Sequence, residues 1–138
     1  MGGITTLGCL TAYPWIDAAA IMMGTPAYVE LAKGQIASVE KKGFKVPLSA
    51  DERKNMFDTL STFDASNHPD NLIETPLFFW HGEKDPVVPY EPTAEFIATL
   101  RKQYGKTNIV LMNEKSAGHA VSRKGLLVSM QWLANSLA

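Results

Sequence analysis

The segment from Thr75 to Pro89, TPLFFWHGEKDPVVP, constrains the fold more than any other part of the chain. Its apolar run, Leu77 to Trp80, shows no polar alternation, which is typical of a strand buried on both faces of a parallel sheet. The run stops at Gly82, and Asp85 follows directly before Pro86. Because proline fixes its own φ and donates no hydrogen bond, Asp85 is expected in a stiff loop after a buried strand.

The composition favours a single domain over residues 1–138, because 138 residues with 46% hydrophobic content supply one ordinary core. Thirteen basic and fourteen acidic side chains give a net charge of −1, which does not favour nucleic acid or an anionic membrane as a partner. Cys9 is the single cysteine, so no intrachain disulfide forms, and no apolar stretch is long enough to cross a bilayer. We expect a cytoplasmic protein.

Helical and strand patterns alternate along the chain. They predict a helix over 2–13, a strand over 15–23, two helices within 25–74, a strand over 77–80, a helix from Pro92, a strand over 108–112 and a last helix. The first helix of the pair is expected to start at Thr25 and Pro26. The last helix carries a stripe of four apolar residues at helical spacing, Leu126, Met130, Leu133 and Leu137. The order predicts an α/β fold of about three parallel strands with flanking helices and a two-helix insertion.

Two polar residues follow predicted strand ends. Asp85 comes after the strand at 77–80, and His119 lies in a loop after the strand at 108–112, preceded by Gly118. Ligands of parallel sheets gather at the carboxyl ends of the strands, and both residues belong to that edge. We therefore expect Asp85 and His119 to form a pair.

These residues also carry a family resemblance. HGEKDPVVP, followed 34 positions after Asp85 by His119, resembles the C-terminal half of an α/β hydrolase. The N-terminal segment MGGITTLGCLTAYPWIDAAAIMMGTPAYVEL resembles bacterial esterases of the prolyl-oligopeptidase branch. The resemblance implies a serine hydrolase acting on a small ester or related acyl substrate. In this role His119 would be the general base, Asp85 would orient its imidazole, and no cofactor would be needed.

In such hydrolases the nucleophilic serine lies on a glycine-rich elbow that often reads G-x-S-M-G-G. Met1, Gly2 and Gly3 would be the last three residues of this motif, so the serine would precede Met1. The backbone amide of Met1 would then occupy the oxyanion-hole position. The resemblance thus predicts that the isolated chain is inactive. The sequence is equally consistent with a natural protein that continues upstream.

Further expectations concern other parts of the chain. The insertion over 25–74 is a candidate lid, with Tyr28 and Phe63 either lining an acyl or alcohol pocket or filling the insertion's own small core. Cys9 is expected in the core, and His81 is expected to support the turn after its strand. His68, with Asp70 nearby, is too weak a ligand set to predict a metal.

A last expectation concerns partners. The strand around Ile16 to Met22 would lack a neighbour on one side, and an exposed apolar edge strand is a template for pairing with another chain. We therefore expect a homodimer joined across this edge. The alternative function is a non-catalytic homodimeric remnant or interaction module.

Overall fold

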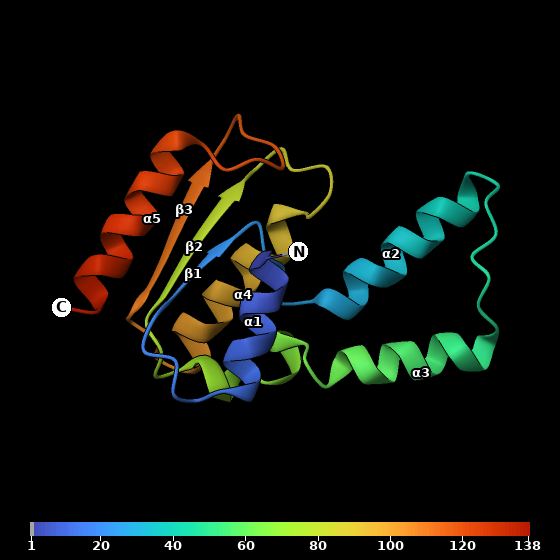
Figure 1. Ribbon diagram of the computed structural model, residues 1–138, viewed down its shortest axis with the longest axis horizontal. Helices are drawn as coiled ribbons and strands as arrows, with labels where there is room; N and C mark the ends of the chain where they lie inside the picture. The colour runs from blue at the N-terminus through green and yellow to red at the C-terminus, as the bar shows by residue number, and fades with distance from the viewer. Residues whose placement is uncertain (1) are drawn as a thin grey trace.

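The computed structural model describes residues 2–138 as a three-stranded parallel sheet with helices on both faces (Figure 1). The elements in chain order are α1 (Gly2–Ala12), β1 (Ala19–Met22), α2 (Tyr28–Lys41), α3 (Ala50–Ser61), the 3₁₀ turns η1 (Ala65–Asn67) and η2 (Pro69–Leu72), β2 (Leu77–Gly82), α4 (Tyr90–Gln103), β3 (Ile109–Glu114) and α5 (Arg123–Ser136). Within this described part, no helix is long and apolar enough to span a membrane.

β2 is the central strand, in the sheet order β1-β2-β3. Leu77 is in register with Ala19 of β1 and with Ile109 of β3, and both pairings are parallel. Every residue of β2 is buried, as the unbroken apolar run predicts. Because all strands run in one direction, their carboxyl ends lie at one edge of the sheet, from which Asp85 and His119 extend.

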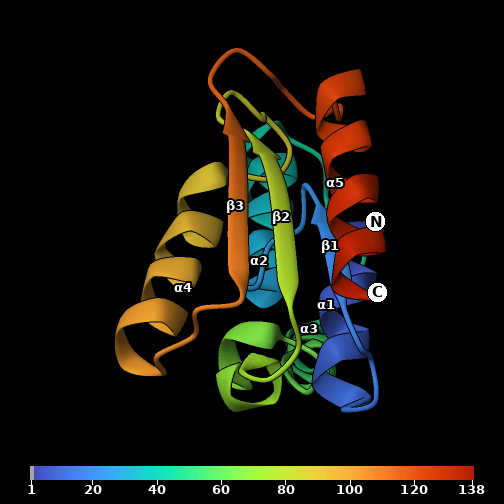
Figure 2. The same cartoon turned by 90° about the vertical axis from the view of Figure 1, so that its left-hand side faces the viewer.

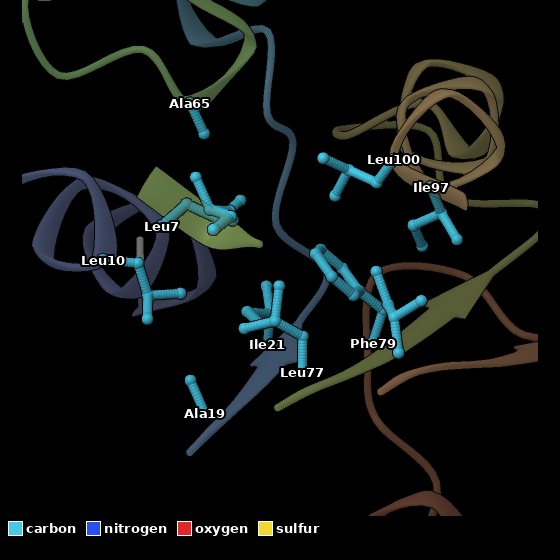
Figure 3. Packing of buried hydrophobic residues seen from close by; sticks show 11 residues of the cluster. Leu7, Leu10, Ala19, Ile21, Ala65, Leu77, Phe79, Ile97 and Leu100 are labelled. Atoms are coloured by element: carbon cyan, nitrogen blue, oxygen red, sulfur yellow. The ribbon is translucent and has the colours of Figure 1, made fainter. Parts of the chain in front are cut away.

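The face of the sheet covered by α1 and α4 holds the main core. Phe79 points toward the side chains of Ile97 and Leu100 on α4, and Leu7 on α1 faces Ile21 (Figure 3). These side chains are almost fully buried. Tertiary packing of two helices on alternate strand residues therefore supplies most of the stability of this layer.

α5 covers the opposite face (Figure 2). Trp132 packs against Phe78 with ring centroids 5.6 Å apart. A Cβ placed on Gly125 would lie 2.4 Å from the Trp80 indole nitrogen, so only glycine permits this close approach. Gly125 and Trp132 thus face the sheet, whereas three residues of the predicted apolar stripe, Leu126, Met130 and Leu137, are 47%, 58% and 63% exposed.

Several predicted boundaries are wrong, and α4, for example, begins at Tyr90 and not at Pro92. β1 contains only Ala19–Met22, and Trp15, which was expected in the strand, is 74% exposed and packs against Tyr13. α2 begins at Tyr28 and not at Thr25 and Pro26. The reason is a long-range cap, since the Asp64 carboxylate accepts a hydrogen bond from the Val29 amide at 2.9 Å.

α2 and α3 form an arm that extends from the body of the protein (Figure 1). Neither helix contains a buried residue, so the insertion has no core of its own and the expectation that Tyr28 and Phe63 fill one is wrong. The predicted capping box of Ser49 and Glu52 is present at the start of α3. The buried Asp64 joins the base of the arm to the body.

Candidate active site

Asp85 lies in a cradle of hydrogen-bond donors just after β2. Its Oδ1 accepts hydrogen bonds from the backbone amides of Val87 at 2.8 Å and Val88 at 2.9 Å. The side chain of Asp85 is fully buried. Pro86 stiffens the loop, so the backbone turn that directly follows Asp85 holds its carboxylate in one orientation.

His119 completes this arrangement from the loop after β3. Its Nδ1 lies 2.8 Å from Asp85 Oδ2, and the imidazole side chain remains 35% exposed. We assign the proton to Nδ1, because the carboxylate can only accept, and this leaves Nε2 with a free lone pair. A buried acid and a partly exposed imidazole are therefore paired in the order that general-base catalysis needs.

The ionised form of Asp85 is favoured. Burial raises the pKa of Asp85, but the hydrogen bonds from the two backbone amides and from His119 outweigh it, and the pKa lies below its usual value of 3.8. Asp85 is thus a carboxylate at neutral pH, which is the state that can orient and stabilise an imidazolium.

His81 supports the acid loop from beneath. Its Nε2 donates to the Val88 carbonyl oxygen at 2.9 Å, and its ring meets Tyr90 edge-on at 5.8 Å between centroids. The imidazole is 1% exposed. His81 therefore has the supporting role that the sequence predicts.

The two site loops touch at Gly82. A Cβ at this position would lie 2.4 Å from the Ala117 carbonyl oxygen and 2.5 Å from that of Gly118. The sequence suggests a sharp turn at Gly82, but the reason for glycine here is the close approach of the loop that carries His119. No local signal could reveal this contact, because it joins segments 35 residues apart.

A second contact fixes the far end of the His119 loop. Glu114, the last residue of β3, accepts hydrogen bonds from Trp80 Nε1 at 2.9 Å and from Ser122 Oγ at 2.5 Å. The Ser122 hydroxyl in turn accepts from the Gly125 amide and caps α5. The hydrogen bonds from Ser122 and Trp80, of which the one from Ser122 has the larger effect, lower the pKa of Glu114. The loop is thereby tied to the sheet on both sides of His119.

A cavity of about 330 Å³ opens beside the imidazole. It is lined by His119, by Met22 and Met23 at the end of β1, by Ala20, and by Gly2, Gly3 and Thr6 of α1. No serine or cysteine is among these residues. Met1, the expected oxyanion-hole residue, lies outside the described residues.

Tyr28 and Phe63 line a different groove, of about 370 Å³, between α1 and the base of the arm. Ile4, Ala12 and Leu60 add to its largely apolar wall, and neither Asp85 nor His119 belongs to it. Cys9 also lines this groove and is only half-buried, so its expected place in the core is wrong. The two aromatic residues do share a groove, but it is separate from the cavity at His119.

Within residues 2–138, no cluster of three histidine, cysteine, aspartate or glutamate side chains is suited to a metal ion. His68 precedes the turn η2 and Asp70 lies within it, and the His68 backbone carbonyl accepts from the Asn71 amide. These residues form part of a local turn.

Comparison with known proteins decides the family. The model of the prolyl oligopeptidase family matches residues 1–138. The chain belongs to this family. The putative esterase YitV of Bacillus subtilis is 39% identical over 99% of the chain, which covers 54% of YitV. Esterase YjfP of Escherichia coli is 33% identical over 64% of the chain, covering 34% of that protein.

Solved structures show the same fold. The chain superposes on TT1662 from Thermus thermophilus with a TM-score of 0.68 at 15% identity, covering 98% of the chain and 50% of TT1662. Acetyl xylan esterase 1 from Thermoanaerobacterium gives a TM-score of 0.63 at 18% identity, with 99% of the chain and 43% of that structure covered. The predicted partial α/β-hydrolase fold is confirmed. This member of the prolyl oligopeptidase family spans about half the length of the relatives compared, or less.

Proposed function

We propose that the chain supplies the acid and the general base of a serine hydrolase acting on carboxylic esters. The observation that carries the proposal is the 2.8 Å contact between His119 Nδ1 and the buried Asp85 carboxylate. The relatives YitV and YjfP, which are named a putative esterase and an esterase, favour ester bonds as the substrate class.

In the proposed reaction, His119 Nε2 removes the proton of a serine hydroxyl as the oxygen attacks the ester carbonyl carbon. Asp85 holds Nδ1–H and stabilises the imidazolium that forms. The same proton then passes to the alcohol that leaves, and an acyl-serine remains. A water molecule, deprotonated by His119 in turn, releases the acid and restores the serine.

Among the described residues, the cavity lining holds no serine or cysteine, so the serine of this reaction has to come from polypeptide other than that lining. By itself the 138-residue chain should therefore not hydrolyse esters. Turnover of p-nitrophenyl acetate by the purified chain, lost in His119→Ala, would contradict this part of the proposal.

A chimaera tests the role of the pair. The chain would replace the matching 54% of YitV, and hydrolysis of p-nitrophenyl acetate would be measured. His119→Ala and Asp85→Ala should each reduce kcat by at least about a thousandfold, as expected for members of a triad. His68→Ala is the matched control and should leave kcat unchanged. Full activity of the His119→Ala chimaera would refute the assignment.

A further inference from the structure

The arm formed by α2 and α3 ends in a basic loop. Residues 41–45, with the sequence KKGFK, follow the last turn of α2 at the end of the arm that is far from the sheet (Figure 1). All of them are exposed. Lys41, Lys42 and Lys45 give this segment, the basic tip, three positive charges and no negative one, although the net charge of the chain is −1. The net charge therefore conceals a local basic surface.

The acidic side chains nearest in sequence to the basic tip are engaged elsewhere. Glu40 accepts a hydrogen bond from Arg53, and this bond lowers the pKa of Glu40. Glu52 accepts from the amide and the hydroxyl of Ser49 at the start of α3. Asp51 lies in the same first turn, where the positive end of the helix dipole offsets a carboxylate. Among residues 2–138, none of the three lysines of the tip takes part in an ion pair.

A large apolar side chain lies among these lysines in a fixed backbone conformation. Gly43 has a φ of 88°, and its amide donates to the Glu40 carbonyl at 2.9 Å. The Phe44 amide donates to the Val39 carbonyl at 3.3 Å, which completes the Schellman motif that ends α2. In this motif the residue after the glycine often packs against the helix, yet Phe44 remains 66% exposed. The motif thus presents the phenyl ring to solvent.

The needs of the helix explain only part of this composition. Lys41 and Lys42 stabilise the negative end of the α2 dipole, but Lys45 and Phe44 lie beyond the helix and have no such role. An exposed aromatic ring among lysines matches the interface of an anionic bilayer, where apolar side chains enter the acyl boundary and lysines meet the headgroups. Nucleic-acid sites combine many phosphate contacts, often from arginine, and residues 41–45 contain no arginine. The composition therefore favours lipid.

We propose that the basic tip docks the protein on anionic phospholipid surfaces, with Phe44 inserted at the acyl boundary and the three lysines among the headgroups. Because the arm extends away from the body, the tip can meet a flat surface without obstruction by the sheet and its helices (Figure 1). Each lysine near an anionic surface strengthens binding about fivefold, so three lysines give roughly a hundredfold preference over a neutral bilayer. The association is reversible and does not depend on the proposed esterase function.

The test is co-sedimentation of the 138-residue chain with vesicles of phosphatidylcholine alone or mixed equally with phosphatidylserine. Binding is expected to the mixed vesicles and should weaken at about 1 M salt, which screens the lysines. Lys45→Gln should weaken binding about fivefold and Phe44→Ser about tenfold. The matched controls are Lys102→Gln, at an exposed lysine of α4, and Leu126→Ser, at a half-exposed leucine of α5. Both should bind as the wild type does.

Circular dichroism of each variant would show that it keeps the wild-type fold, as expected for changes at exposed side chains. The proposal is overturned if the chain binds neither kind of vesicle or binds both equally well. It is also overturned if Phe44→Ser binds as the wild type does, or if Leu126→Ser weakens binding as much as Phe44→Ser. Tighter binding to duplex DNA than to the mixed vesicles would assign the lysines to nucleic acid and count against a lipid partner.

Discussion

Replacing Asp85 by asparagine tests the energetics of the site. The carboxylate accepts three hydrogen bonds, from two backbone amides and His119. A hydrogen bond to a charged group contributes about 1 kcal/mol more than a neutral one, so losing the charge removes roughly 3 kcal/mol. Asparagine also avoids burying a charge, which offsets part of this loss. We therefore expect Asp85→Asn to lower the free energy of unfolding by about 1–2 kcal/mol at pH 7.

The effect should depend on pH with a defined sign. Because the folded-state pKa of Asp85 lies below 3.8, the carboxylate contributes stability above that pH and loses it as the pH falls through the folded-state pKa. Urea unfolding followed by circular dichroism at pH 7 and at about pH 3 measures the difference. Asp17→Asn, at an exposed carboxylate, is the control. Equal stability of Asp85→Asn and wild type at pH 7 would refute the reasoning.

Three further changes probe other contacts. Gly82→Ala should push the His119 loop away from β2, and chemical-shift changes at His119 would detect it; an unchanged spectrum would contradict the close approach. Lys106→Met leaves the buried Thr75 carbonyl and two partly buried acceptors, the Ile73 carbonyl and Asn108 Oδ1, without their ammonium donor, and it should destabilise the fold by about 2–4 kcal/mol in urea unfolding, with a loss below 1 kcal/mol as the contrary result. Asp64→Ala removes the cap at Val29, so hydrogen exchange should accelerate in the first turn of α2 but not in α3.

Local patterns predicted the central part of the fold well. The run at Leu77–Trp80 predicts β2 because a strand covered on both faces needs apolar residues at every position. Asp85 and His119 were expected at one edge because parallel strands end together. These inferences need only residue type, spacing and the rule that the chain alternates between helix and strand.

Local sequence patterns could not predict the contacts between segments that are distant along the chain. The cap that Asp64 provides to Val29 shifts the start of α2, yet 35 residues separate the two. Periodicity correctly identified the apolar stripe of α5, but it cannot say which neighbour covers a helix face. The sheet instead packs against Gly125, where the Trp80 indole leaves no room for a side chain, and against Trp132, which contacts Phe78. Most of the stripe, Leu126, Met130 and Leu137, remains exposed in this chain.

The protonation state of His119 provides the most direct test of the account. Long-range ¹H–¹⁵N correlation spectra of the neutral imidazole report which ring nitrogen carries the proton. The account predicts the proton on Nδ1, donated to Asp85, with Nε2 free to act as the base. It also predicts that Asp85→Asn changes this preference. A proton on Nε2 in the wild-type chain, unaltered by Asp85→Asn, would contradict the proposed acid–base pair.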